Sequence, residues 1–210
     1  MYTRFGKRLF DILLLLATGP PAIVLMLVVA VAIRLSSGPP VLFRQKRVRD
    51  GERLFTLYKF RTMAPPPGGD PRAVRDEQRL GRLGRVLRRS SLDELPQLWN
   101  ILRGEMSFVG PRPLLDIYIP RYAAHERLRH SVPQGLTGWS QVTSRNAALW
   151  SERFEQDLWY LRHRSFALDL KILLLTVGKV LSRTGVSKPG HTTCDEFLGY
   201  SHDGQSNDGH

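Results

Sequence analysis

Residues 9–33 read LFDILLLLATGPPAIVLMLVVAVAI, and this apolar run decides how the rest of the chain must be placed. A helix needs about 20 apolar residues to cross the hydrocarbon core of a bilayer, so the run is long enough for membrane contact. A cleaved signal peptide is disfavoured, because the run is longer than the apolar part of such peptides and no small-residue cleavage site follows it. The stretch therefore predicts a permanent membrane segment.

Three features of this segment favour a re-entrant helix, which enters and leaves the membrane by the same face, over a spanning helix. The triplet Gly19-Pro20-Pro21 lies near its middle, where tandem prolines remove two backbone donors and bend a helix. Asp11 lies inside the run and is costly in hydrocarbon unless it is paired or close to the interface. Both flanks are basic, which places both ends on the cytoplasmic side by the positive-inside rule. The spanning alternative stays open at this point.

The charge balance points to polyanionic partners. The 210 residues include 31 Lys and Arg against 19 Asp and Glu, a formal net charge of +12. Such an excess suits anionic lipid head groups, phosphorylated substrates or nucleic acid. Nucleic acid is disfavoured, because the basic residues are spread along the chain and no nucleic-acid-binding signature occurs. A single cysteine, Cys194, excludes an intramolecular disulfide and a thiolate metal cluster.

Turn signals and apolar periodicity divide the rest of the chain into short elements. Asp50-Gly51 between two β-prone runs predicts a β-hairpin that ends near Lys59 and Arg61. Apolar residues at helical spacing predict helices over 72–89, 94–106, 114–130, 148–163 and 165–181, and 133–146 is expected to be a loop with strand character. The last of these helices is too short to span readily and is typical of a core or membrane-interface helix.

These elements predict an α-rich α+β fold in three parts. Residues 1–35 form a re-entrant membrane helix-break-helix, and residues 36–190 form a compact domain on the cytosolic face, with interfacial helices and a small β-hairpin. Residues 191–210 are polar and are expected to form a disordered tail.

The stretch SLDELP (91–96) carries two adjacent carboxylates and admits two interpretations. Ser91 followed three residues later by Glu94 is a capping box, in which Asp93 would also favour the helix N-terminus. Pro96 weakens this interpretation, because it would fall inside the helix, where its missing N–H costs a hydrogen bond. A helix that starts close to Pro96 avoids this conflict and leaves both carboxylates at the helix mouth.

Neighbouring carboxylates can divide their roles, one binding a divalent cation and the other attacking or accepting a proton. Mg²⁺ typically takes one or two protein carboxylates together with substrate phosphates. Arginines and a helix N-terminus nearby would receive the phosphate charge. The residues alone therefore indicate Mg²⁺-assisted phosphoryl chemistry at a membrane surface.

Several longer motifs, read together, resemble the bacterial sugar transferase family, the small monotopic phosphoglycosyl transferases. They cover residues 4 to 190, and the third is long and highly specific: FRQKRV (43–48), YKFRTM (58–63), SLDELPQLWNILRGEMSFVGPRP (91–113), GLTGWSQV (135–142), KRLFDILLLL (7–16) and DLWYLRHRSFALDLKILLLT (157–176). The family's re-entrant helix breaks at a Ser-Pro or similar pair, which stands here as Pro20-Pro21 after Gly19. The resemblance implies a catalytic domain on the cytoplasmic face of the bacterial inner membrane.

The resemblance also implies a reaction. A sugar-1-phosphate moves from a UDP-sugar to polyprenyl phosphate, usually undecaprenyl phosphate, and UMP leaves. Asp93 matches the family's nucleophile and would form a phosphosugar-aspartyl intermediate, while Glu94 would help to hold Mg²⁺. Two alternatives remain: Asp93 as a general base in one direct transfer, and a non-enzymatic, basic, membrane-anchored binding protein.

Further positions match the family's pattern. The Pro-Arg-Pro element Pro111, Arg112 and Pro113 is implied to lie near the nucleotide, and Lys59, Arg88 and Arg145 are implied to contact phosphates. Gly138, Trp139 and Asp157 also match, and for these a structural role is at least as well supported.

Overall fold

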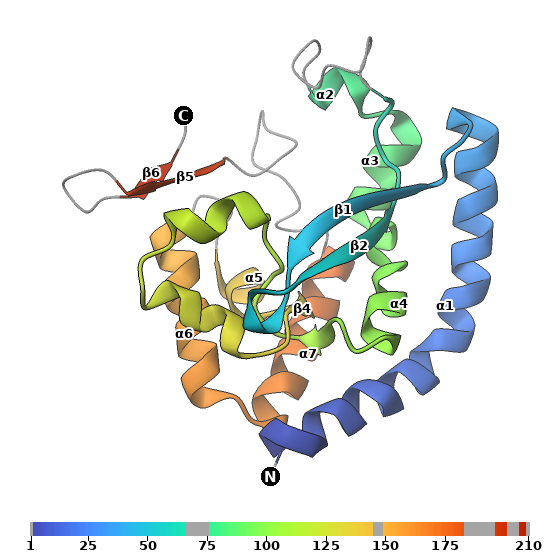
Figure 1. Ribbon diagram of the computed structural model, residues 1–210. Helices are drawn as coiled ribbons and strands as arrows, with labels where there is room; N and C mark the ends of the chain where they lie inside the picture. The colour runs from blue at the N-terminus through green and yellow to red at the C-terminus, as the bar shows by residue number, and fades with distance from the viewer. Residues whose placement is uncertain (1, 66–75, 145–148, 183–195, 201–205, 209–210) are drawn as a thin grey trace.

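The hairpin confirms the prediction made from Asp50-Gly51. The computed structural model describes residues 2–65, 76–144, 149–182, 196–200 and 206–208. Strands β1 (Leu42–Val48) and β2 (Leu54–Phe60) pair antiparallel, joined by the 3₁₀ turn Asp50–Glu52. Gly51 has a φ of +65° there, a conformation that glycine adopts without steric cost. Figure 1 shows this long ribbon lying across the middle of the molecule.

Helix α1 (Lys7–Ser37) follows a short π-helical turn (Tyr2–Gly6) and is 31 residues long. Among the described residues it is the one helix long and apolar enough to cross a bilayer by length and composition. Pro20 and Pro21 lie inside it, and it continues helically through them rather than breaking into two helices. Figure 1 shows instead a bend between its N-terminal arm and its upright C-terminal arm, as internal prolines produce.

Both ends of α1 pack against the rest of the chain. At the N-terminal end, Lys7 donates to Asp169 at 2.6 Å, and Asp11 accepts from the Ser107 hydroxyl at 2.8 Å and from the Phe108 backbone N–H at 3.0 Å. Asp11 is therefore paired inside protein rather than exposed to hydrocarbon.

The C-terminal end of α1 is held by apolar packing. Val29 and Ile33 are buried against Phe60 and Leu87. The stretch between the two anchored ends carries exposed apolar side chains, among them Leu13, Leu16, Ile23, Val24, Leu27 and Val28.

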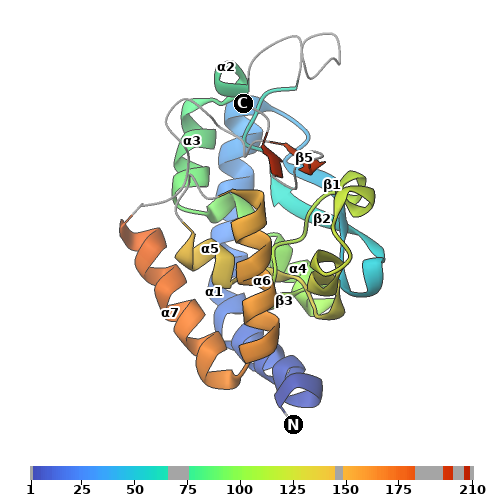
Figure 2. The same cartoon turned by 90° about the vertical axis from the view of Figure 1, so that its left-hand side faces the viewer.

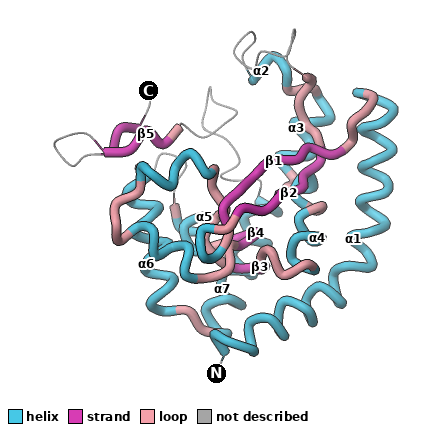
Figure 3. Tube along the Cα trace, in the orientation of Figure 1, coloured by secondary structure: helices cyan, strands magenta, loops and turns pink. Residues whose placement is uncertain are grey.

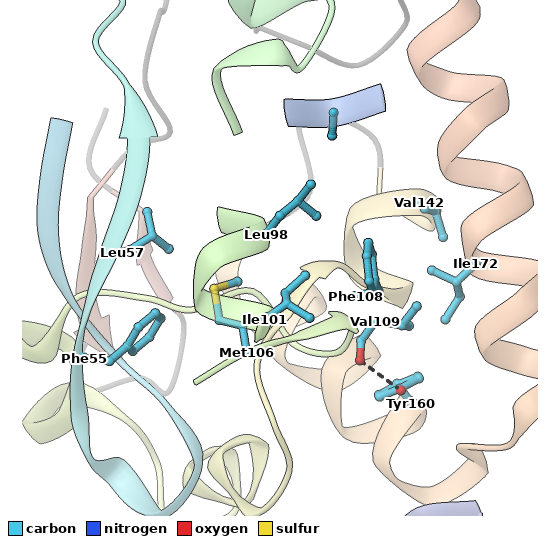
Figure 4. Packing of buried hydrophobic residues seen from close by; sticks show 11 residues of the cluster. Phe55, Leu57, Leu98, Ile101, Met106, Phe108, Val109, Val142, Tyr160 and Ile172 are labelled. Atoms are coloured by element: carbon cyan, nitrogen blue, oxygen red, sulfur yellow. Dashed lines mark hydrogen bonds between the residues drawn. The ribbon is translucent and has the colours of Figure 1, made fainter. Parts of the chain in front are cut away.

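A central core joins α1 and β2 to the helices of the second half (Figure 4). It is built from α4 (Gln97–Leu102), β3 (Ser107–Val109), α5 (Trp139–Thr143), α6 (Trp150–His163) and α7 (Phe166–Ser182). Ile101, Val109 and Ile172 are fully buried at its centre. Figure 2 shows α5, α6 and α7 gathered on one side of the molecule. Helices α6 and α7 confirm the two helices expected over 148–163 and 165–181.

Strand β3 pairs in parallel with β4 (Gly135–Thr137), and the chain around this pair is packed backbone to backbone. A Cβ on Gly135 would lie 2.1 Å from the Gly110 nitrogen, and a Cβ on Gly138 would lie 2.1 Å from the Gly110 oxygen. No side chain fits at either position. The segment 133–146 thus contains strand β4 and the short helix α5 rather than a loop alone.

Within the described residues, three of the expected helices differ from the prediction. The helix expected over 72–89 is divided into α2 (Asp76–Arg79) and α3 (Arg82–Arg89), because Leu80 bridges to Met63 and Gly81 is extended. The helix expected over 94–106 is limited to α4. The α-helix expected over 114–130 is wrong: the chain forms 3₁₀ helices at Asp116–Arg121 and Glu126–Ser131, and Pro120 lies inside the first. Figure 3 shows the chain here as short helical pieces joined by loop.

The disordered tail expected over 191–210 is wrong for its described part. Strands β5 (Phe197–Tyr200) and β6 (Ser206–Asp208) pair antiparallel. Phe197 is fully buried against an aromatic cluster of Tyr118, Tyr122, Trp150 and Phe154. The polar composition of the tail gave no sign of this packing, because only a few aromatic side chains, Phe197 and the partly buried Tyr200, make it.

Candidate active site

The two carboxylates lie at the mouth of α4. Ser91 has a φ of +55°, Leu92–Glu94 form one 3₁₀ turn, and α4 begins at Gln97 with Pro96 at its N-cap position. Neither helix start has a side-chain cap hydrogen bond, so the capping box is wrong. The start near Pro96 is confirmed. A tight 3₁₀ turn followed by proline places Asp93 and Glu94 ahead of the helix rather than within it.

Glu94 is held by two cations. Lys59, near the end of β2, donates to Glu94 Oε1 at 2.5 Å, and Arg112 donates to the same oxygen at 2.7 Å. All three side chains are partly buried. Although burial opposes ionisation, the charges of Arg112 and Lys59 hold the pKa of Glu94 far below its usual range. Burial also lowers the pKa of Lys59, and Glu94 offsets only part of this effect.

Asp93 differs sharply from its neighbour. Burial and the adjacent charge of Glu94 raise the pKa of Asp93 to about 6, against the opposing charges of Lys59, Arg88 and Arg112. Two neighbouring titratable groups whose environments separate their pKa values are typical of groups with separate chemical roles. Arg88, in the last turn of α3, also donates from Nε to the Thr62 hydroxyl at 3.0 Å.

The backbone of the Pro-Arg-Pro turn is fixed by its neighbours. The Gly110 N–H donates to the Thr137 carbonyl at 2.9 Å, and the Gly135 N–H donates to the Pro111 carbonyl at 2.8 Å. Pro111 and Pro113 are buried, whereas the Arg112 side chain is partly exposed. The two prolines therefore form a rigid frame from which Arg112 reaches Glu94.

The structure brings together most of the site residues expected from the sequence. Lys59, Arg88, Asp93, Glu94 and Arg112 form one cluster, drawn from β2, α3, the 3₁₀ turn and the segment after β3. Pro111 and Pro113 frame it. Arg145 lies outside the described residues.

Arg47, on β1, is a site neighbour that the sequence analysis did not single out. Its Nε is buried without a hydrogen-bond partner, while its Nη2 donates to Gln45 at 2.7 Å. Burial and the nearby charge of Arg112 lower the pKa of Arg47 to about 10. The available sequence signal is its place in FRQKRV (43–48), one of the motifs that resemble the bacterial sugar transferase family.

The carboxylate pair fits a divalent cation that shares its ligands with a substrate. No group of three or more His, Cys, Asp or Glu side chains that could hold a metal occurs within the described ranges. Mg²⁺ needs no such cage, since one or two carboxylates and substrate phosphates suffice. Lys59 and Arg112 both donate to one oxygen of Glu94, Oε1. Asp93 precedes Glu94 directly in the chain.

Comparison with known proteins places the chain among sugar transferases. A family model described as bacterial sugar transferase matches residues 2–183. The chain is 47% identical over 197 residues to the "Uncharacterized sugar transferase EpsL" of Bacillus subtilis (strain 168), covering 92% of this chain and 96% of that protein.

Two further relatives are named by their reactions. The UDP-glucose:undecaprenyl-phosphate glucose-1-phosphate transferase of Xanthomonas campestris pv. campestris is 41% identical over 76% of this chain and 35% of its own length. The UDP-N-acetylgalactosamine-undecaprenyl-phosphate N-acetylgalactosaminephosphotransferase of Aeromonas hydrophila is 37% identical over 86% of this chain and 45% of its own length. The chain thus spans less than half of each of these two relatives.

Proposed function

Because the chain belongs to the bacterial sugar transferase family, we propose that it transfers a sugar-1-phosphate from a UDP-sugar to polyprenyl phosphate and releases UMP. The observation that carries the proposal is the difference between the two carboxylates. Glu94 is neutralised by two cations, whereas Asp93 beside it keeps a pKa raised to about 6. The relatives named by their reactions use undecaprenyl phosphate as acceptor and support the choice of a lipid phosphate.

The chemistry proceeds by two displacements at one phosphorus. An Asp93 carboxylate oxygen attacks the β-phosphorus of the donor, the bond from that phosphorus to the bridging oxygen breaks, and UMP leaves with the electron pair. An oxygen of polyprenyl phosphate then attacks the same phosphorus and breaks its bond to Asp93, which regenerates the carboxylate. The product is a polyprenyl diphosphate sugar, and no external redox partner or proton donor is required for the balance.

The residues around Asp93 carry out the supporting tasks. Arg88 and Arg112 supply positive charge where the transferred phosphoryl group gains negative charge. Lys59 holds Glu94 in place and keeps it ionised. Mg²⁺, held by Glu94 and the substrate phosphates, would neutralise phosphate charge when bound.

The rate of UMP release should fall at acid pH. Asp93 must be deprotonated to attack, and a pKa raised to about 6 means that its protonated form accumulates below this pH. We expect the rate under kcat/KM conditions to fall about tenfold per pH unit below pH 6 and to level off above it. Initial rates measured between pH 5 and 8 check this, and a rate that stays flat or rises toward pH 5 contradicts it.

We propose that α1 is monotopic, with both of its ends and the catalytic domain on the cytoplasmic face of the inner membrane. Both ends of α1 pack against the same domain, which supports this topology. Lys7 and Asp11 make the contacts at the N-terminal end, and Val29 and Ile33 make those at the C-terminal end. A straight span would separate these ends by the thickness of the bilayer. The basic flanks would then face anionic head groups. Exposed apolar side chains on α7, such as Leu174, Val177 and Leu181, would lie at the interface.

Single cysteines introduced at Thr3 and Asp50, with Cys194 replaced by Ser, test this topology. An impermeant thiol reagent added to sealed, inside-out vesicles is expected to label both positions, and neither position in intact spheroplasts. Labelling of the two positions from opposite sides would show that α1 spans the membrane.

UMP release from a panel of UDP-sugars, with undecaprenyl phosphate and Mg²⁺, tests the proposed reaction. Release that requires the lipid phosphate over many turnovers, together with a lipid-linked sugar product, is expected for at least one donor. If purified full-length chain in detergent or nanodiscs releases UMP from none of them, the proposed function is wrong, and a basic membrane-anchored binding protein becomes the better interpretation.

A further inference from the structure

The buried ion pair between Arg129 and Asp157 lies directly behind the Pro-Arg-Pro turn. Arg129 donates from Nε and Nη2 to Asp157 Oδ2 at 3.1 and 2.8 Å. Both side chains are almost fully buried. Removing charged groups from water is costly, and a buried pair of this kind need not add net stability. Its presence therefore calls for an explanation other than stability.

The pair contacts the site through one hydrogen bond. Nη2 of Arg129 also donates to the backbone carbonyl of Arg112 at 2.8 Å. Arg112 in turn donates from its own side chain to Glu94 at 2.7 Å. A single buried guanidinium thus joins Asp157 on α6 to the backbone of the residue that holds Glu94.

The remaining contacts keep this guanidinium in one orientation. The Ser140 hydroxyl donates to the other Asp157 oxygen, Oδ1, at 2.7 Å, so both oxygens of the carboxylate are used. The Arg129 guanidinium lies over the Phe154 ring at 5.6 Å and over the Tyr122 ring at 5.9 Å. A planar group held by hydrogen bonds along its edge and packed against two aromatic rings has little rotational freedom.

Successive residues of the turn are held at the backbone. Gly110 donates to Thr137, Pro111 accepts from Gly135, and Arg112 accepts from Arg129. The first two bonds come from the β4 side, where the glycines allow backbones to touch. The third comes from a side chain, so it can be removed by substitution.

We infer that Arg129 and Asp157, oriented by Ser140, are positioning residues that fix the Arg112 backbone so that its side chain points at Glu94. This inference rests on the proposed function for its kinetic consequence. The inference also assigns a role to the motif GLTGWSQV (135–142). Gly135 and Gly138 leave room for the backbone of the Pro-Arg-Pro turn. Ser140 orients the Asp157 carboxylate, which in turn orients Arg129. A misplacement of about 1 Å at such a site can cost about 100-fold in rate.

The decisive variant removes the pair without leaving a buried charge. Arg129→Met, Asp157→Leu and Ser140→Ala are combined, because buried pairs replaced by apolar groups of similar volume often leave the fold intact. We expect a cooperative thermal transition and a loss of about 10- to 100-fold in kcat/KM for UMP release. Arg127→Gln is the matched control, since Arg127 lies in the same 3₁₀ helix and pairs with Glu52 at 2.6 and 2.8 Å on the surface. It should keep its rate within about twofold.

A mutant cycle separates positioning from general damage. If the pair acts through Arg112, the triple substitution should cost less than about twofold when Arg112 is already Met, because the two losses share one cause. Losses that multiply, or a triple variant with the rate of the unsubstituted chain, overturn the inference.

Hydrogen exchange keeps the inference testable if the proposed reaction fails. Should the unsubstituted chain release no UMP, amide exchange of a peptide covering residues 107–115 is compared among the same variants. Faster exchange in the triple variant but not in Arg127→Gln supports positioning, and unchanged exchange contradicts it.

Discussion

Replacing Asp93 with Asn is expected to lower UMP release by about four to six orders of magnitude, because the loss of a covalent nucleophile can cost about 10⁶ in kcat. The amide keeps the size of the side chain but cannot attack phosphorus. Stability should not fall, because the raised pKa of Asp93 shows that its charge is unfavourable in the folded state beside Glu94. Rates and thermal transitions of the variant and the unsubstituted chain, measured side by side, check both statements.

Asp116→Asn is the matched control for this substitution. Asp116 is a partly buried carboxylate in the 3₁₀ helix after the Pro-Arg-Pro turn, and it accepts from the Ile117 N–H. The Asp116→Asn variant should release UMP at nearly the rate of the unsubstituted chain. An Asp93→Asn variant with more than about a tenth of the rate would show that Asp93 is not the nucleophile.

Loss of activity alone does not separate covalent from direct transfer, since a general base at Asp93 would be lost as well. Incubation with a donor labelled in its sugar-phosphate, without lipid acceptor, separates them. The covalent route predicts one label per chain, UMP released in equal amount, and no label on Asp93→Asn. If no label ever joins the protein and initial rates require a ternary complex, direct transfer to polyprenyl phosphate is the better mechanism.

Replacing Glu94 with Gln should have the second largest effect, a loss of about 100- to 1,000-fold in kcat. Gln has nearly the same shape, but it leaves Lys59 and Arg112 facing a neutral amide in a partly buried site. Unpaired charges in such surroundings are costly, so the thermal transition should also fall. The direction of the stability change therefore distinguishes the two carboxylates: Glu94 contributes to folding, whereas Asp93 does not.

The same variant tests the metal assignment. If Glu94 helps to hold Mg²⁺, the Mg²⁺ concentration for half-maximal rate should rise about 10- to 100-fold in Glu94→Gln. Glu155→Gln, an exposed glutamate near His125, is the control and should change neither value. An unchanged Mg²⁺ requirement together with a low rate would assign Glu94 to the orientation of Lys59 and Arg112 instead.

The sequence alone determined the features that depend on residues close together along the chain. The hairpin follows from Asp50-Gly51 between β-prone runs, and α6 and α7 follow from apolar spacing. The helix start that the Ser91 capping box suggested is wrong, because Pro96 and the positive φ of Ser91 determine the local backbone conformation. The α-helix predicted over 114–130 is wrong, because apolar spacing does not distinguish an α-helix from 3₁₀ turns interrupted by proline.

Only the tertiary structure determined which residues that are distant in the sequence contact one another. No local signal predicts that Lys59 and Arg112, far apart in the chain, meet on one oxygen of Glu94, or that Arg129 reaches the carbonyl of Arg112. The burial of Phe197 and the pairing of Asp11 have the same origin. Local backbone preferences act over a few residues and can be read from the sequence. The cost of desolvating a charge depends on which distant groups are packed around it, and only the folded chain determines that.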